Sequence, residues 1–270
     1  MEHLLSNWKA ISEQIQTAKQ ILFLSDFDGT LAPIVEKPEM AFMPENISRR
    51  LEELTHDQRF IVGIISGRAL SDLKERVNID GIIYAGNHGF EIEGPGVNFI
   101  NPTAEEIKPF LKAIQHFLSL TLGTIKGVLV EDKGITLSVH YRQAKEEKAR
   151  DIEAAVKHSI NGLSARGLLK VTSGKKVYEV RPAVNWDKGK AIRFLMKKYG
   201  KGGRQSGLLP IYLGDDLTDE DGFRIVEKYD NGITVHIGGT NAGTAARYFL
   251  DSIDEVAVFL EKLLDNSQEQ

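Results

Sequence analysis

The sequence predicts an α/β protein: a parallel sheet covered by helices, with a smaller α+β domain inserted into it. Five short apolar runs lack polar alternation, which is typical of buried parallel strands, and segments with helical periodicity separate them. Residues 101–182 differ, because strands there alternate between apolar and polar residues and are joined by short turns. We therefore expect a core domain formed by residues 1–100 and 183–270 and an inserted domain formed by residues 101–182.

The expected elements of the core follow in chain order. The first is an amphipathic helix near the amino terminus, which packs on the core through Leu4, Leu5, Ile11 and Ile15. Strands are expected at residues 21–25, 60–66, 82–85, 209–213 and 232–237, and helices at residues 45–54, 69–77, 188–199 and 220–228. Residues 201–207 are expected to form a flexible loop and residues 266–270 a frayed tail.

The inserted domain is expected to follow the order α-β-β-α-β-β. Helices at residues 104–120 and 144–160 each precede a hairpin, formed by strands 128–131 and 135–141 and by strands 169–172 and 177–181. Period-two alternation separates an apolar face, which packs on the helices, from a polar face turned toward the core. The apolar face carries Ile135, Leu137, Val139, Tyr141, Tyr178 and Val180, and the polar face carries Thr136, Ser138, His140, Arg142, Glu179 and Arg181.

Composition excludes several classes of protein. The 270 residues include no cysteine, so disulfides and thiolate metal sites are impossible. No apolar run approaches the ~20 residues of a membrane-spanning helix, and charges interrupt the amino-terminal helix, unlike a signal peptide. The net charge of −4 disfavours nucleic-acid binding. We expect a cytoplasmic protein with no membrane or nucleic-acid partner, and a monomer, because no large apolar stripe is left unassigned.

The segment that follows the first apolar strand carries two aspartates, Asp26 and Asp28, spaced by two. Ligands of open α/β sheets bind at the carboxyl ends of the strands. There one carboxylate can attack phosphorus to give an aspartyl-phosphate, and a neighbouring carboxyl group can transfer protons. Gly29 lets the backbone turn sharply near a phosphate, and Thr30 can donate a hydrogen bond to it. The alternatives are a strand-ending turn or a calcium loop, but an EF-hand would need a helix, not a strand, before it.

A second acidic segment, which includes Asp215, Asp216 and Asp219, follows the strand at residues 209–213. So many carboxylates at one strand end would repel one another unless a cation lay among them. Magnesium prefers a few carboxylates together with water and phosphate oxygens, and we assign its direct contact here to Asp215. The alternative, which holds for Thr218 and Asp219, is capping of the helix that follows.

Two further segments are weaker indications by themselves. Ser66 and Gly67 end one strand and open a helix, where a phosphate could bind, although a serine there more often caps the helix. Lys188 begins another helix and could neutralise the charge of a phosphoryl group in transfer, although a lone lysine is usually solvated.

In chain order these segments supply a nucleophile, a hydroxyl group, a lysine and paired acids, with the inserted domain between the second and the third. This arrangement resembles the haloacid dehalogenase (HAD) superfamily of phosphatases. The resemblance implies a Rossmann-like three-layer core with a parallel sheet and a C2-type α+β cap. It implies that Asp26 is the nucleophile and Asp28 the general acid and base, and that phosphate is bound by Thr30, Ser66, Gly67 and Lys188. It also implies Mg²⁺ held by Asp26, the Asp28 backbone carbonyl and Asp215, with Asp216 and Asp219 in its outer shell.

A narrower resemblance, to trehalose-6-phosphate phosphatases, covers most of the chain. Its motifs are Tyr84-Ala85-Gly86-Asn87-His88-Gly89, Glu131-Asp132-Lys133-Gly134, Val139-His140-Tyr141-Arg142, Gly174-Lys175, Glu179-Val180-Arg181-Pro182 and the acidic segment at residues 214–220. A disaccharide offers many hydroxyl groups, and a site with matching polar groups rejects analogues that lack one. The resemblance implies sugar contacts from Asn87, His88, Glu131, Lys133, Glu179, Arg142 and Arg181. The short segment before residue 21 is expected to indicate a stand-alone phosphatase rather than a fusion to a synthase.

Several alternatives stay open at this point. Residues 87–89 could form an ordinary turn, and the charged residues of the inserted domain could be solvated strand and hairpin positions or a linker. The substrate could be another sugar phosphate, of the sucrose-phosphate or mannosyl-phosphoglycerate type. A non-catalytic sugar-phosphate sensor is a second class, which the presence of all four catalytic positions disfavours. A signalling receiver is a third class, and it would need neither the inserted domain nor Asp28.

Overall fold

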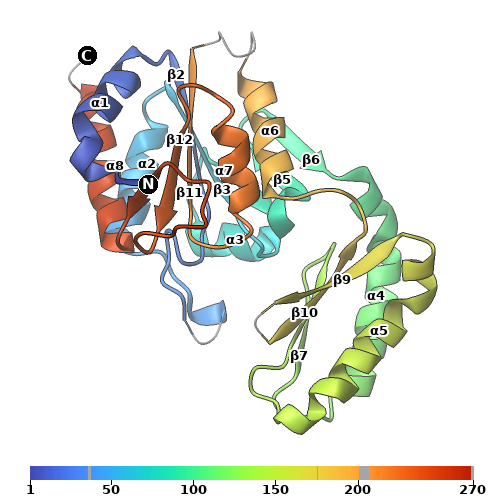
Figure 1. Ribbon diagram of the computed structural model, residues 1–270. Helices are drawn as coiled ribbons and strands as arrows, with labels where there is room; N and C mark the ends of the chain where they lie inside the picture. Colours follow the sequence, from blue (N-terminus) through green and yellow to red (C-terminus); the bar gives the residue numbers. More distant parts are fainter. Residues whose placement is uncertain (36–37, 175, 201–206, 269–270) are drawn as a thin grey trace. The chain divides into compact units, whose positions relative to one another are not determined.

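The computed structural model in Figure 1 describes all residues except 36–37, 175, 201–206 and 269–270. The described chain divides into two compact units, Met1–Asn98 with Trp186–Gln270, and Phe99–Asn185. The second unit begins two residues before the expected insertion, residues 101–182, and ends three residues after it. The expected loop at residues 201–207 falls, apart from Gly207, outside the described residues.

The first unit contains a sheet with the strand order β1-β13-β12-β11-β2-β3-β4-β5-β6. Its strands are β1 Glu2–His3, β2 Gln20–Ser25, β3 Phe60–Ile65, β4 Ile83–Gly86, β5 Glu91–Gly94, β6 Val97–Ile100, β11 Leu208–Gly214, β12 Ile233–Ile237 and β13 Tyr248–Leu250. Neighbouring strands from β1 to β4 pair in parallel, and β5 pairs antiparallel with β4. All five expected strands are confirmed, with ends that shift by one residue.

Helices cover both faces of this sheet. Figure 1 shows α1 (Trp8–Thr17), α2 (Glu45–Thr55) and α8 (Ile253–Gln268) on one side, and α6 (Lys188–Tyr199) and α7 (Glu220–Val226) on the other. Helix α3 (Leu70–Val77) connects β3 to β4, and a short loop joins it to each strand. The four expected helices are confirmed. Chain order runs outward from β2 through β3 to β4 and then returns to β11 on the other side of β2, so the topological switch point, where ligands bind in such sheets, lies between β2 and β11.

Several core elements were not expected. They are β1, β5, β6, β13 and α8. Because α8 extends to Gln268, the expectation of a frayed tail is wrong for residues 266–268, and residues 269–270 lie outside the described part. The amino-terminal helix begins only at Trp8: Leu5 belongs to a 3₁₀ turn, Leu5–Asn7, and Leu4 precedes it, although Leu4 is fully buried.

The second unit has the expected order α-β-β-α-β-β. Its sheet has the order β7-β8-β10-β9, formed by β7 Leu129–Asp132, β8 Leu137–His140, β10 Val177–Pro182 and β9 Leu169–Gly174, and all its pairings are antiparallel. α4 (Pro102–Leu122) and α5 (Ala149–Ala165) pack on one face of it. The expected helix at residues 144–160 is thus displaced, because a 3₁₀ turn, Glu146–Lys148, precedes α5.

The apolar face of this second sheet joins the two helices in one core. Leu137, Val139, Tyr178 and Val180 pack with Ile107, Leu111, Ile114 and Ile152 among others. The expected separation of faces is confirmed for these strand positions. Asn101 caps α4 by accepting a hydrogen bond from the Thr103 amide at 3.2 Å, and Pro102 occupies the first turn, where a proline is tolerated.

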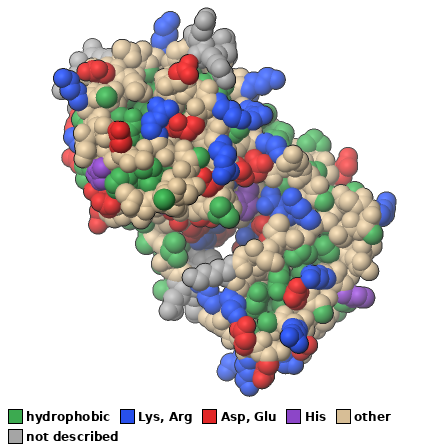
Figure 2. Space-filling view, viewed as in Figure 1, with side chains coloured by type: hydrophobic (Ala, Val, Ile, Leu, Met, Phe, Trp, Pro, Cys, Tyr) green, Lys and Arg blue, Asp and Glu red, His purple; other side chains and the backbone are tan. Residues whose placement is uncertain are grey.

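The surface of the described chain carries mixed charge. Figure 2 shows lysine and arginine side chains interspersed with aspartate and glutamate side chains over the visible face, in line with a net charge of −4. No described helix combines the length and the apolarity that crossing a membrane requires.

We predict that Phe259→Ala lowers the free energy of unfolding of the core by ~3–5 kcal/mol, because truncation of a buried phenylalanine leaves a cavity. Phe259 is fully buried and its ring centroid lies 6.2 Å from that of Trp8. Urea denaturation followed by tryptophan fluorescence measures the effect. The matched control is Val258→Ala, since Val258 is 41% exposed, and a change below ~0.5 kcal/mol is expected for it. Equal losses for both variants would contradict the packing of α8.

Candidate active site

Predicted site residues follow the carboxyl ends of neighbouring parallel strands of the core. Asp26 and Asp28 follow β2, Ser66 follows β3, Asn87 follows β4 and Asp215 follows β11. These strands are adjacent in the order β11-β2-β3-β4 and run in parallel, so their carboxyl ends share one edge of the sheet. The backbone ties the two central segments together, because the Asp26 amide donates to the Leu213 carbonyl at 2.9 Å.

A buried lysine bridges two buried carboxylates at this edge. The Nζ atom of Lys188 lies 2.8 Å from Asp26 Oδ1 and 2.7 Å from Asp219 Oδ1. Lys188 is 2% exposed and Asp26 is 5% exposed. Lys188 is the first residue of α6, whose cap Asp187 accepts a hydrogen bond from the Lys190 amide at 2.8 Å. The alternative that Lys188 is a solvated helix lysine is therefore wrong.

Asp219 organises the acidic segment after β11. Its Oδ1 atom accepts from the Tyr212 hydroxyl group at 2.5 Å, and its Oδ2 atom accepts from the amides of Asp215 and Asp216, both at 3.1 Å. The Asp216 carboxylate accepts from the amide and the hydroxyl group of Thr218. Asp219 occupies the N-cap position of α7, but its side chain makes no capping hydrogen bond, so the expected capping by this side chain is wrong.

The acidic residues shift one another's protonation. Burial, followed by repulsion from Asp219 and Asp215, holds the pKa of Asp26 well above its ordinary value, although Lys188 opposes this. Burial, with repulsion from Asp219 and Asp216, raises the pKa of Asp215 to about 7. Burial would lower the pKa of Lys188, but attraction to Asp219 and Asp26 outweighs it and raises that pKa. The lysine is therefore protonated, and it does not neutralise all the acids around it.

Gly29 and Thr30 hold Asp215 at the site. Gly29 has a φ of +84°, and a Cβ atom there would lie 2.1 Å from Asp215 Oδ2, so both its conformation and its lack of a side chain are required. The buried Thr30 hydroxyl group donates to Asp215 Oδ1 at 3.2 Å. The expectation that this hydroxyl group donates to phosphate needs correction, because its one proton already binds a carboxylate.

The donor set fits a divalent cation. Oxygen atoms of Asp26, Asp215 and Asp219 all lie within 4.8 Å of one another. Carboxylate oxygens are the ligands that hard divalent cations prefer, and a cation would relieve the repulsion that raises the pKa of Asp26 and Asp215. Because both oxygens of Asp219 already accept hydrogen bonds, Asp26 and Asp215 are the candidates for direct contact. The contribution of the Asp28 carbonyl stays a prediction.

The Asp28 carboxylate lies in the fork of an arginine that the sequence interpretation overlooked. The Nε and Nη2 atoms of Arg68 donate to its two oxygens at 2.7 and 2.6 Å, and Arg68 also donates to Asp72 at 2.8 Å. The Asp28 side chain is 40% exposed, unlike the buried Asp26. A sequence signal existed, since Arg68 comes two residues after Ser66 at the same strand end.

Ser66, Gly67, Asn87 and His88 form a second group at the site edge. Ser66 Oγ accepts from the Arg68 amide at 3.2 Å, and α3 begins only at Leu70, so helix capping by Ser66 is wrong. A Cβ atom on Gly67 would lie 2.8 Å from the His88 ring, which shows how closely the two segments approach. Asn87 and His88 both have positive φ, at 52° and 58°, a conformation that costs energy in residues other than glycine and often marks functional segments.

Predicted sugar-binding residues also gather within the second unit. Strand register places Glu131, Ser138, Glu179 and Thr172 in one row on the face opposite its apolar core. His140 lies 2.8 Å and the Lys133 Nζ atom 4.0 Å from Glu131 Oε2, and Arg181 lies 3.6 Å from Glu179 Oε2. Arg142 is the exception: β8 ends at His140, and Arg142 lies exposed in the turn that follows, so its expected place on the polar face is wrong.

Comparison with known proteins decides the family. A model of the trehalose-phosphatase family matches residues 24–254. The chain belongs to the trehalose-phosphatase family. The trehalose-phosphate phosphatase of Mycobacterium tuberculosis strain H37Rv is 40% identical over 248 residues, which are 91% of this chain and 62% of that protein. The chain therefore spans less than two thirds of this mycobacterial relative.

Solved structures of a trehalose-6-phosphate phosphatase and of a haloacid dehalogenase-like hydrolase share the fold. The C-terminal domain of trehalose-6-phosphate phosphatase from Candida albicans is 26% identical, with a TM-score of 0.75, over 96% of this chain and 97% of that one. A haloacid dehalogenase-like hydrolase from Bacteroides thetaiotaomicron is 17% identical with a TM-score of 0.62, over 91% of this chain and 100% of that one, and shares the fold alone. The predicted family and fold class are confirmed.

We predict that, without a divalent cation, the core is more stable near pH 5 than near pH 8. The folded-state pKa of Asp215, about 7, lies above its ordinary value of 3.8. The folded protein therefore holds a proton that the unfolded chain has released, and this contribution to the free energy of unfolding is lost as the pH rises through 7. Magnesium at ~100 times its Kd adds ~2.7 kcal/mol, a rise in Tm of roughly 5 °C or more. Thermal denaturation with and without magnesium measures both effects.

Asp215→Asn should abolish most of the magnesium effect and the part of the pH dependence that comes from Asp215, while the part that comes from the raised pKa of Asp26 stays. Asp230→Asn, which removes an exposed acid in the turn before β12, serves as the matched control and should keep both. A magnesium effect that survives Asp215→Asn would place the cation elsewhere.

Proposed function

We propose that this protein is a magnesium-dependent phosphatase that hydrolyses trehalose 6-phosphate to trehalose and phosphate. One observation carries the proposal: Asp26 is buried at the end of β2, paired with Lys188 and within 4.8 Å of the other acids, in a chain whose family is shown. A carboxylate held in this way can act as a nucleophile, and the adjacent ammonium group can stabilise the negative charge of the phosphoryl group that it attacks.

The proposed first step forms an aspartyl-phosphate. An oxygen of Asp26 attacks phosphorus, the bond from phosphorus to the sugar oxygen breaks, and Asp28 gives its proton to that oxygen. In the second step a water oxygen attacks phosphorus, Asp28 takes a proton from the water, and the bond to Asp26 breaks to release phosphate. Each step needs a separate carboxyl group for bond formation and for proton transfer, and the strand end supplies both.

The other core residues bind and orient the phosphoryl group. Lys188 supplies a fixed positive charge next to the attacking carboxylate. Ser66 accepts a hydrogen bond from the Arg68 amide, which leaves its own proton free to donate to a phosphate oxygen. When bound to Asp26 and Asp215, magnesium would neutralise charge on the phosphoryl oxygens. The choice of magnesium over other divalent cations rests on the oxygen donor set and on the family.

The sugar is the part of the substrate that the second unit would recognise. Its polar row and the side chains that pair with it offer both carboxylates and cations, among them Glu131, Lys133, Glu179 and Arg181, which together can accept from and donate to hydroxyl groups. Asn87 and His88 are the proposed contacts from the core. Arg142 is the weakest candidate, because it lies exposed in the turn after β8.

Two other functions compete with this one. A phosphatase for another disaccharide or sugar phosphate would use the same core, and a non-catalytic sugar-phosphate sensor would use the same fold. Against the sensor, the structure holds Asp26, Lys188 and Asp215 in a charged, buried arrangement that binding alone does not need. A cytoplasmic location and a monomeric state also remain proposals, and light scattering tests the second.

The deciding experiment is phosphate release from trehalose 6-phosphate, sucrose 6-phosphate, glucose 6-phosphate and 4-nitrophenyl phosphate, with magnesium and with a chelator. We expect magnesium-dependent turnover with the highest kcat/KM on the trehalose ester. A higher kcat/KM on the sucrose ester would refute the substrate assignment, and no turnover of any ester would favour the sensor.

Asp26→Asn should lower kcat on every ester by a factor of ~10⁴ or more, because the nucleophile is removed from both steps. Asp187→Asn is the matched control: it changes an aspartate that caps α6 and should alter stability more than turnover. Retained turnover of Asp26→Asn would reject the aspartyl-phosphate route. Circular dichroism checks that both variants are folded.

A further inference from the structure

The side chain of Asp28 is held by a single residue. Among the described residues, Arg68 alone donates to its carboxylate, with Nε 2.7 Å from Oδ2 and Nη2 2.6 Å from Oδ1. Asp26 is held by Lys188 and Asp215 by Thr30, so the three carboxylates have separate partners. Because Asp28 is 40% exposed, packing alone does not fix its conformation.

Arg68 is itself held in place from several sides. Its side chain is 10% exposed, its guanidinium carbon lies 5.4 Å above the centre of the Phe27 ring, and its Nη1 atom donates to Asp72 at 2.8 Å. Because the guanidinium group is held on these sides, it also fixes the orientation of the carboxylate that it binds, since two parallel N–H···O bonds define the carboxylate plane.

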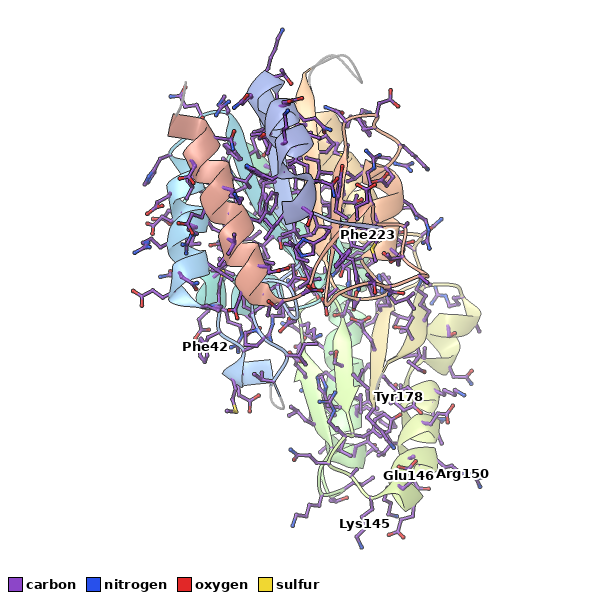
Figure 3. All side chains as sticks on the ribbon, turned by 60° about the vertical axis from the view of Figure 1, so that its left-hand side comes forward. Phe42, Lys145, Glu146, Arg150, Tyr178 and Phe223 are labelled. Atoms are coloured by element: carbon purple, nitrogen blue, oxygen red, sulfur yellow. The ribbon has the colours of Figure 1, made fainter. Side chains whose placement is uncertain are left out.

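The network continues from Asp72 into the loop after β2. Arg76, one turn further along α3, donates to Asp72 at 2.8 Å and to the carbonyls of Glu39 and Ala41 at 3.0 and 3.1 Å. Its guanidinium carbon lies 5.7 Å from the ring of Phe42, which Figure 3 labels at the edge of the core. Helix α3 thus anchors Arg68 by an ion-pair chain on one side, while Asp28 binds on the other.

We propose that Arg68 is a positioning residue for proton transfer: its fork fixes the carboxyl group of Asp28 where the leaving oxygen receives the proton. This inference rests on the proposed function. Arg68 forms no bond to phosphorus and transfers no proton itself. When one Asp28 oxygen carries the proton, the other still accepts from the fork, so the carboxyl group stays oriented through both steps.

The test uses the leaving group, because only a poor leaving group needs a proton. Release of the leaving group is measured in a single turnover with enzyme in excess of substrate. Arg68→Lys keeps the charge but loses the fork. We expect a fall of ~10–100-fold with trehalose 6-phosphate, within the range that misplacement of a proton donor costs. With 4-nitrophenyl phosphate, whose phenolate leaves unprotonated, we expect a change below ~3-fold.

A double-variant cycle separates positioning from a structural role. If Arg68 acts through Asp28, Arg68→Lys should have almost no further effect in an Asp28→Asn background. Asp72→Asn should show the same dependence on the leaving group, with a smaller loss, and it keeps the test available if Arg68→Lys is unstable. Arg59→Lys is the matched control: it alters an arginine that pairs with Asp57 before β3 and should leave both rates unchanged.

Equal losses on both esters, or additive losses in the double variant, would overturn the positioning role. Failure of the proposed function gives a different result. A wild-type protein that cleaves phenyl esters but not trehalose 6-phosphate would overturn the substrate assignment alone. Phenyl phosphate and 4-nitrophenyl phosphate would then decide the role of Arg68 in the same cycle. A wild-type protein that cleaves no ester would overturn both proposals.

Discussion

The buried ammonium group of Lys188 is the interaction on which the core site depends. It joins the start of α6 to the end of β2 and to the turn after β11, through Asp26 and Asp219. A buried charge without partners would cost several kcal/mol, so these three groups stabilise one another only as a set. Removal of Lys188 would leave both carboxylates without their counter-charge, which ties the position of the nucleophile to two distant parts of the chain.

The set is not neutral, and this has a chemical consequence. Lys188 has two buried carboxylates at hydrogen-bond distance, and Asp215 adds a third to the same cluster. Both oxygens of Asp219 accept hydrogen bonds from within the core, including one from Tyr212. Asp219 therefore stabilises the turn that follows β11. Burial first, and repulsion among the acids second, raise the pKa of Asp26 and of Asp215, and a divalent cation between these two carboxylates would relieve that repulsion.

The sequence predicted the elements whose residues show a local pattern of apolar and polar side chains. Apolar runs identified β2, β3, β4 and β11, because strands buried on both faces show no alternation, and β12 was found although Thr234 and His236 interrupt its apolar residues. Strands β1 and β13 have two and three residues, too few for any periodicity to be visible. Helix α8 does carry a helical pattern of apolar residues and could have been found. Which side chain pairs with which was less accessible: the contacts of Thr30 with Asp215 and of Arg68 with Asp28 depend on how loops from different strands meet.

Chemistry and substrate choice belong to different parts of this chain. The core holds every residue proposed to touch phosphorus or to move a proton, and such a set would serve any phosphate monoester. The polar face of the second unit contains no group that the reaction needs, yet acidic and basic side chains pair there, opposite the face that carries the apolar core. A solvated face has no need of such an arrangement, whereas a ligand with many hydroxyl groups does. The substrate assignment therefore depends on this polar face and the reaction type on the core, and either one can fail without the other.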